Sequence, residues 1–295
     1  MRTPLSSRPA PERAPRSRIV SLLFSTHPGP SAAVTVVTIV LGIAIGLDPW
    51  RVALLGLAML FDQFSVGLCN DWIDAERDAA VGRRDKPVAR GWISASTVRN
   101  AAFVAAALAI LLTVPLGWLA ALAHLVFLVS AWTYNLGLKR TPASVLPYIV
   151  SFGLLPAIVT LARSEPAGAA PWAIALGALL GVAAHFANVL PDLDDDAATG
   201  VRGLPHRIGR RVSGIATYLV LAVASVVAFA GLGGIGLGGA GWLQLAGLVL
   251  SLGIAATGIL LVLTRPPSRL LFRLIIAAAL VDVALLATAG EHLLA

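Results

Sequence analysis

The stretch NDWIDAERD, residues 70–78, decides the fold because it ends an apolar segment that is long enough to cross a membrane. The residues before it, 51–69, read RVALLGLAMLFDQFSVGLC. Four acidic side chains then follow within eight positions: Asp71, Asp74, Glu76 and Asp78. Charge at the edge of the hydrocarbon layer is costly and usually functional. The pattern therefore predicts a membrane-spanning helix that ends in a functional polar site.

The composition extends this prediction to the whole chain. Of the 295 residues, 58% are hydrophobic and only 13% are charged, and the mean hydropathy is +0.86. A water-soluble domain carries about 25% charged residues, so we predict an all-α, polytopic membrane protein. Nine stretches have the length of a transmembrane helix, about 20 residues: 31–48, 51–70, 95–114, 116–133, 145–162, 172–190, 213–232, 241–263 and 271–290.

The nine predicted spans are preceded by a tail and contain one irregular link. Residues 1–26 are rich in Pro, Arg and Ser and are predicted to form a disordered basic tail, followed by a single transmembrane domain over 27–295. The tail does not resemble a signal peptide, because it lacks a clean apolar core followed by a cleavage site. The glycine-rich segment 231–241 is either a loop or a frayed helix. The single cysteine, Cys69, excludes an intramolecular disulfide framework and most thiolate metal sites.

The basic residues predict the orientation in the membrane. If nine helices cross, all 22 Lys and Arg residues except Arg51 and Arg163 fall on one side. Positive charge marks the cytoplasmic side. The N-terminus and the acidic segment are therefore expected in the cytoplasm, and the C-terminus outside the cell (inner) membrane. The net charge of +7 is thus a sign of topology and not of nucleic-acid binding.

The acidic segment occurs twice. The pattern Asn70-x3-Asp74-x3-Asp78 recurs, 118 residues later, as Asn188-x3-Asp192-x3-Asp196. Further identities at the same offset are Gly82 with Gly200, Arg84 with Arg202, and Pro87 with Pro205. Both copies follow an even-numbered predicted span, the second and the sixth. So many matches at one offset indicate an internal duplication, and we expect two duplicated helical halves around a central cavity.

The spacing gathers oxygen ligands on one face of each copy. At about 100° per residue, one face holds Asn70, Asp71, Asp74 and Asp78, and the other copy's face holds Asn188, Asp192, Asp195 and Asp196. Glu76 and Asp194 point away, and Pro191 weakens the second helix. Facing carboxylates need a neutralising cation, and oxygen ligands favour Mg²⁺ or Ca²⁺.

A phosphate-bearing ligand fits this prediction. Mg²⁺ usually completes its shell with substrate phosphate oxygens, and six basic residues near the acidic segments could hold the same anion: Arg84, Lys86, Lys139, Arg140, Arg202 and Arg207. An apolar bundle lies beneath the charged groups. A ligand with a diphosphate head and a hydrocarbon tail, a prenyl diphosphate, suits both parts.

Three motifs resemble those of a known family. NDWIDAERD resembles the first Asp-rich signature, NDxxDxxxD, of the UbiA superfamily of intramembrane prenyltransferases, and DLDDD (192–196) is similar to its second signature, DxxxD. YNLGLK (134–139) is similar to the family's Tyr/Lys motif. Two departures are RRDKP, where many members have an Arg-Pro pair, and GLP (203–205), where many have Thr-Leu-Pro.

The resemblance implies a role for particular residues. The metal ligands for Mg²⁺ would be Asp71, Asp74, Asp78, Asp192 and Asp196. The diphosphate would contact Asn70, Arg84, Lys139, Asn188 and Arg202. The residues that would take part in catalysis are four of the metal ligands, Asp74, Asp78, Asp192 and Asp196, together with Tyr134. Tyr134 would line the pocket near the reacting carbon. The expected activity is prenyl transfer from a prenyl diphosphate to an aromatic or otherwise lipophilic acceptor.

Other interpretations remain open at this point. A terpene cyclase or a phosphoribosyl transfer onto polyprenyl phosphate would use the same superfamily site, and an ion-coupled transporter would also have repeats with acidic residues. Asp62 could orient substrate but is expected to pair with Gln63. His185 could approach the site, although a hydrogen-bonded histidine inside the bundle is favoured. His124 and Asp282 are expected to be structural.

Overall fold

Long apolar helices make up most of the part of the chain that the computed structural model describes, which is residues 17–83, 86–234, 241–265 and 269–295. The α-helices are α1 (Arg18–Phe24), α2 (Pro28–Ala44), α3 (Pro49–Ile73), α4 (Ala75–Ala80), α5 (Ala95–Thr113), α6 (Trp118–Leu136), α7 (Leu146–Leu161), α8 (Pro171–Val189), α9 (Leu193–Ala198), α10 (Leu204–Gly231), α11 (Gly241–Thr264) and α12 (Arg269–Ala287). Short 3₁₀ helices are η1 (Val114–Leu116), η2 (Leu138–Arg140), η3 (Pro142–Val145) and η4 (Gly290–Leu293). The all-α prediction is confirmed.

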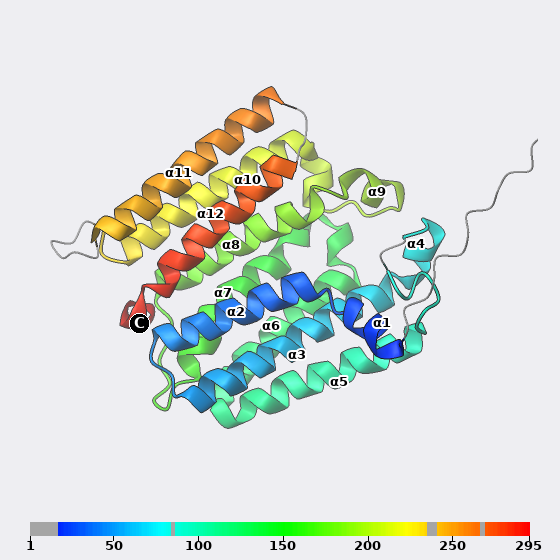
Figure 1. Ribbon diagram of the computed structural model, residues 1–295, viewed down its shortest axis with the longest axis horizontal. Coiled ribbons are helices and arrows are strands. Elements are labelled where there is room, and N and C mark those ends of the chain that lie inside the picture. Colours follow the sequence, from blue (N-terminus) through cyan, green and yellow to red (C-terminus); the bar gives the residue numbers. More distant parts are fainter. Residues whose placement is uncertain (1–16, 84–85, 235–240, 266–268) are drawn as a thin grey trace, which may run out of the picture.

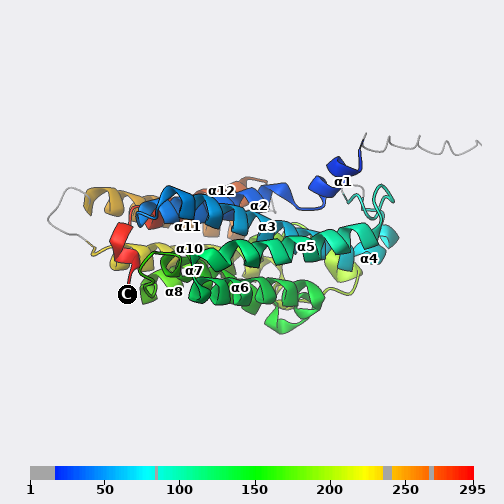
Figure 2. The ribbon, with the colours of Figure 1, turned by 90° about the horizontal axis from the view of Figure 1, so that it is seen from below.

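The long helices run roughly along the long axis of the molecule (Figures 1 and 2). Short α1, α4 and α9 lie at one end of the bundle, and the C-terminus lies at the other (Figure 1). Arg51 and Arg163 mark the C-terminal end, where Arg51 Nη1 donates to the carbonyl of Ala162 at 2.8 Å and Arg163 Nη1 to that of Ile45 at 3.3 Å. These two arginines, the two that the sequence separates from the other basic residues, therefore lie at the end of the bundle opposite α4 and α9.

The count of nine transmembrane helices is slightly too high. Among the described residues, seven helices are long and apolar enough to cross a membrane, or eight if α1 and α2, bent by 64°, count as one span. α2 alone has 17 residues, too few to qualify. Each of the nine predicted stretches nevertheless overlaps a helix, and the last of them, α12, is not among those that qualify.

The duplication is visible in the arrangement of the helices. With the offset of 118 residues, α2 corresponds to α7, α3 to α8, α5 to α10 and α6 to α11. The neighbours correspond too, since α3 packs against α2 and α5 while α8 packs against α7 and α10. Among the described helices, α12 stands outside this correspondence.

The backbone after each acidic segment also repeats. The amide of Asp78 donates to the carbonyl of Asp74 at 2.8 Å, and the equivalent bond in the second copy has the same length. Gly82 and Gly200, which occupy equivalent positions, both adopt a left-handed conformation, with φ of 70° and 82°. This conformation costs glycine little and other residues considerably more. The matching glycines therefore preserve the same turn after both acidic segments.

The acidic segments are less regular than the helical-wheel argument assumes. In the first copy α3 ends at Ile73 and α4 begins at Ala75, so the helix is interrupted at Asp74. In the second copy α8 ends at Val189 and α9 begins only at Leu193. Pro191 lies in this gap, as the steric restriction on the residue before a proline predicts.

Two further boundaries differ from expectation. α10 begins at Leu204, nine residues before the predicted 213, because a short helical segment joins it across a kink at Gly209 (φ 81°, ψ 161°). The predicted disordered tail contains α1, whose N-cap Ser17 accepts a hydrogen bond from the amide of Val20. Most of the glycine-rich segment, 235–240, lies outside the described residues, as does the tail over 1–16.

Candidate active site

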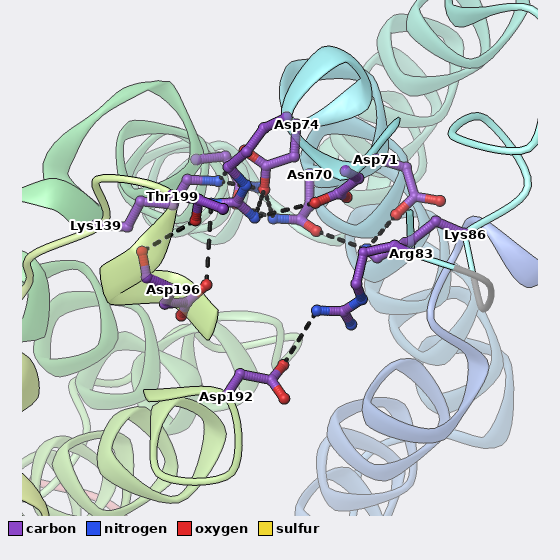
Figure 3. Close-up of polar contacts among 12 residues, drawn as sticks. Asn70, Asp71, Asp74, Arg83, Lys86, Lys139, Asp192, Asp196 and Thr199 are labelled. Atoms are coloured by element: carbon purple, nitrogen blue, oxygen red, sulfur yellow. Dashed lines mark hydrogen bonds and ion pairs between the residues drawn. The ribbon is translucent and has the colours of Figure 1, made fainter. Parts of the chain in front are cut away.

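Asp74 is the centre of the polar cluster at the α4 end of the bundle. Its side chain is buried, and both carboxylate oxygens accept from Lys139 Nζ, at 2.7 and 2.6 Å (Figure 3). Asn70 Nδ2 donates to Asp74 Oδ2 at 3.0 Å. Asp74 and Lys139 are 65 positions apart in the chain. Their contact brings together the first acidic segment and the Tyr/Lys motif, both of which the sequence analysis assigned to one diphosphate site.

Lys139 reaches Asp74 from η2, directly after α6. Gly137 ends α6 with φ of 154°, and the chain then turns inward. Burial lowers the pKa of the Lys139 ammonium below its ordinary value, and the Asp74 carboxylate opposes this shift. Asn135, which the sequence interpretation overlooked, fixes the approach of α6, because its Oδ1 accepts from Asn70 at 3.2 Å and its Nδ2 donates to the carbonyl of Val66 at 3.1 Å.

Asp71 belongs to a second, separate group of contacts. Its Oδ1 pairs with Lys86 Nζ and, at 2.9 Å, with His27 Nε2 (Figure 3). Lys86 Nζ also donates to Asn70 Oδ1 at 3.0 Å. The predicted single face of carboxylates is therefore divided, with Asp71 turned toward the α1–α2 corner and Asp74 toward η2. Asn70 contacts both groups.

Arg77 joins the two acidic segments, although the sequence interpretation gave it no role. Its Nη2 lies 3.1 Å from Asp74 Oδ2 and 3.3 Å from Asp78 Oδ1, and its Nη1 lies 4.0 Å from Asp196 Oδ1. The signal that could have found it is its position inside the motif, one turn after Asp74. The two copies of the acidic segment thus meet across one guanidinium group.

The second acidic segment is more open than the first. The side chain of Asp192 is 46% exposed and lies 3.5 Å from Arg83 Nη1 (Figure 3). The side chain of Asp196 is 21% exposed, and His206 Nε2 lies 3.8 Å from it. Burial raises the pKa of the Asp196 carboxyl, while Arg77 and His206 act in the opposite direction. Asp194 points away, as predicted: it is 85% exposed.

Two residues that the sequence interpretation assigned to the diphosphate, Asn188 and Arg202, are exposed and are not among the Asp74 contacts described above. Arg84 lies outside the described residues. Tyr134 packs at the end of α6 in an aromatic group with Tyr148 and His185, its ring centroid 5.2 and 5.7 Å from theirs.

The other polar residues that the sequence analysis discussed, Asp62, His124, His185 and Asp282, each have a protein partner inside the bundle. Gln63 Nε2 donates to Asp62 Oδ2 at 2.9 Å, the pairing that the sequence analysis favoured. His124 lies 3.5 Å from Asp62. His185 Nε2 lies 3.0 Å from Ser144 Oγ, which accepts from the amide of Leu204. The buried Asp282 accepts from two serine hydroxyls, Ser225 and Ser251.

The donor set of the cluster suits a hard divalent cation. Among the described residues, no group of three His, Cys, Asp or Glu side chains already has metal-site geometry. Positively charged side chains lie on the carboxylates instead: Lys139 and Arg77 on Asp74, and Lys86 on Asp71. Because the available ligands are carboxylate and amide oxygens, they fit Mg²⁺. The ammonium and guanidinium groups that contact these carboxylates lie where a bound metal ion could lie.

The structure is thus a helical bundle with apolar helices long enough to cross a membrane, and with carboxylates and buried lysines gathered at one end. The model of the UbiA prenyltransferase family matches residues 31–285, and the chain belongs to this family. It is therefore a multi-pass membrane enzyme of the prenyl-transferring class.

Solved structures agree with the family in fold. A UbiA homologue from Archaeoglobus fulgidus bound to DMAPP and Mg²⁺ has a TM-score of 0.69 at 13% identity, covering 91% of this chain and 98% of that one. The apo UbiA homologue from Aeropyrum pernix K1 has a TM-score of 0.64 at 19% identity, covering 91% and 98%. A digeranylgeranylglyceryl phosphate synthase has a TM-score of 0.63 at 14% identity, covering 92% and 97%. No curated protein sequence matches the chain.

Proposed function

We propose that this enzyme transfers a prenyl group from a prenyl diphosphate to an aromatic or otherwise lipophilic acceptor, with Mg²⁺ as its cofactor. The observation that carries the proposal is the meeting of the two acidic segments across Arg77, with Lys139 on the other side of Asp74. Carboxylates and cations alternate there at distances of 2.6 to 4.0 Å. This arrangement suits a ligand that brings both a metal ion and a polyanion.

The charges of the cluster explain how such a ligand would be held. Asp74, Asp78 and Asp196 would take the metal, directly or through water, and Asp71 and Asp192 would extend the oxygen ligands on either side. Lys139 and Arg77, released from Asp74, would donate to the diphosphate oxygens, since hydrogen bonds between charged groups are the strong ones. When bound, Mg²⁺ would neutralise the negative charge that builds on the leaving diphosphate.

The surroundings of the cluster suit the hydrocarbon part of the substrate. Tyr134 and Tyr148 present aromatic surfaces next to His185, and Phe152 stacks on Tyr148 with centroids 6.1 Å apart. The electron-rich faces of such rings stabilise positive charge that develops on carbon. Tyr134 is therefore assigned to the reacting end of the prenyl chain. Loss of a proton from the acceptor completes the transfer.

Relatives and topology support the same assignment. Two structures of the A. fulgidus homologue contain Mg²⁺ with DMAPP or GPP. The basic residues gather near the acidic segments, so we place the N-terminus and the active site in the cytoplasm and the C-terminus outside the inner membrane. A transporter is not supported, because carrier sites lie near the middle of the bilayer. The helices α4 and α9, which belong to the two acidic segments, lie at one end of the bundle instead (Figure 1).

Release of diphosphate tests the proposal. Purified enzyme would be incubated with Mg²⁺, radiolabelled farnesyl or geranylgeranyl diphosphate and a panel of aromatic acceptors, with wild type compared with Asp74→Asn and Asp192→Asn. We expect both variants to lose turnover. Asp194→Asn is the matched control and should retain wild-type turnover, because this neighbouring side chain is 85% exposed and pairs with Arg210 and not with the cluster.

The products separate the remaining alternatives. A prenylated acceptor supports transfer, whereas a hydrocarbon or alcohol formed without an acceptor would instead identify a cyclase. Absence of diphosphate release with every substrate, or full turnover in the Asp74→Asn variant, would contradict the proposed function.

A further inference from the structure

The side chain of Arg77 contacts carboxylates of both acidic segments. Its side chain is 20% exposed and lies between Asp74 and Asp78 of the first segment and Asp196 of the second, at 3.1, 3.3 and 4.0 Å. Asp74 and Asp78 are almost fully buried, with side chains 2% and 3% exposed. Carboxylates so close together repel one another unless a cation lies between them. In this structure that cation is the guanidinium group.

We infer that Arg77 is an internal counter-ion that holds the metal site closed until the diphosphate arrives. The inference rests on the proposed function. It adds that Arg77 disfavours binding of the metal ion alone and favours binding of the metal ion together with the diphosphate. A metal ion alone must displace the guanidinium from the carboxylates. Metal and diphosphate together offer an exchange, because the carboxylates gain the metal while Arg77 gains the phosphate oxygens.

The chemistry of the guanidinium suits this exchange. It is planar, remains charged at any relevant pH, and presents five N–H donors that match carboxylate and phosphate oxygens equally well. Arg77 lies on the short helix α4, immediately after the interruption of the helix at Asp74. Lys139, the other cation on Asp74, makes both of its contacts there to that single carboxylate. Arg77, by contrast, contacts carboxylates of both halves with one guanidinium group.

The exchange makes an unusual prediction about a single substitution. In Arg77→Gln the carboxylates lose a resident competitor, so a metal ion alone should bind more tightly. The diphosphate loses a cationic partner, so it should bind more weakly. A merely structural arginine would, on substitution, weaken both. With a unit charge removed 3.1 to 4.0 Å from the carboxylates, and partly screened by water, we expect a change of about tenfold in each direction.

The test measures the two affinities separately. Mn²⁺ serves as the metal probe, and its binding to purified protein is followed by electron paramagnetic resonance without any phosphate. Retention of radiolabelled geranyl diphosphate at a fixed Mn²⁺ concentration gives the second affinity. Arg99→Gln is the matched control, because Arg99 is exposed at the start of α5 and its Nε contacts Asn100 at 3.3 Å; it should change neither affinity.

The outcomes distinguish this inference from the proposed function. Opposite changes in Arg77→Gln support it, and Arg77→Lys, which keeps the charge but not the fork of donors, should show the same signs with smaller changes. Arg77→Lys also serves as the test if Arg77→Gln does not fold. Unchanged affinities, or a loss of both, would overturn the role of Arg77 while leaving the enzyme's function intact. If wild-type protein retains no labelled diphosphate with Mn²⁺, the proposed function itself fails.

Discussion

The pair formed by Lys139 and Asp74 allows a quantitative prediction. Both side chains are buried, 5% and 2% exposed, and the ammonium contacts both carboxylate oxygens at 2.7 and 2.6 Å. Replacing Lys139 by Met keeps the apolar stem and removes the charge. Breaking a buried pair typically costs about 3–5 kcal/mol, because the remaining charge is left without its partner.

The other partners of Asp74 reduce this cost. Arg77 and Asn70 still donate to its Oδ2, at 3.1 and 3.0 Å. We therefore expect Lys139→Met to lower the free energy of unfolding by about 2–3 kcal/mol, below the full cost of an unpaired buried charge. The double variant Lys139→Met/Asp74→Asn removes the stranded charge as well and should regain most of this loss, while both variants remain without activity.

Unfolding in detergent, followed by denaturant titration, measures these differences, and the four proteins of the cycle give the coupling energy. Arg140→Met is the matched control, since this neighbour in η2 is exposed, and it should change the free energy of unfolding by no more than about 0.5 kcal/mol. A Lys139→Met protein as stable as wild type, or a double variant less stable than Lys139→Met, would refute the reasoning.

Three further predictions follow from burial and packing. Asp192→Ala should abolish turnover yet change the free energy of unfolding by less than about 0.5 kcal/mol, because this side chain is 46% exposed; thermal unfolding and a turnover assay measure the two effects. Burial raises the pKa of Asp196, so its ionisation opposes folding, and in metal-free protein Asp196→Asn should raise the unfolding midpoint at pH 7, with a gain that shrinks as the pH falls toward about 4, the unfolded-state pKa. No gain at pH 7 would contradict this sign. Gly67→Ala should destabilise by about 1–3 kcal/mol through overpacking, because a Cβ there would lie 2.4 Å from the carbonyl oxygen of Thr26; Gly253→Ala, whose Cβ would meet no atom within 4 Å, is the control, and equal unfolding midpoints for the two variants would disprove the argument.

The helical bundle was largely predictable because its signals are local. A stretch of about 20 apolar residues reports a helix whatever surrounds it, and every predicted stretch overlaps a helix here. The boundaries were less predictable where backbone geometry intervened. Gly209 joins a short segment to α10, and the bend between α1 and α2 at His27, which has a left-handed φ of 54°, decides whether two helices form one span.

The candidate site was predictable in composition and only partly in arrangement. The duplicated Asn/Asp spacing identified the acidic segments, and the motif ending in Lys139 was expected near them. Helical spacing alone placed Asp71 beside Asp74 on one face, whereas their partners divide them between two groups. The contacts of Arg77 and Asn135 were missed because they depend on tertiary packing. The position of Arg77 one turn after Asp74 is a local signal, but its contact with Asp196, like that of Asn135 with Asn70, joins segments far apart in the chain.

The sequence by itself determined that this protein is a duplicated helical bundle in a membrane, with two acidic segments and a cluster of basic residues at the same end. Those properties depend on hydropathy and on spacing along the chain. Only the tertiary structure decided which cation lies on which carboxylate: Lys139 on Asp74, Lys86 on Asp71, and Arg77 between the two halves. The physical reason is that ion pairing falls off over a few ångströms. The distances between residues that are 15 to 65 or more positions apart in the chain are set by how the helices and loops pack.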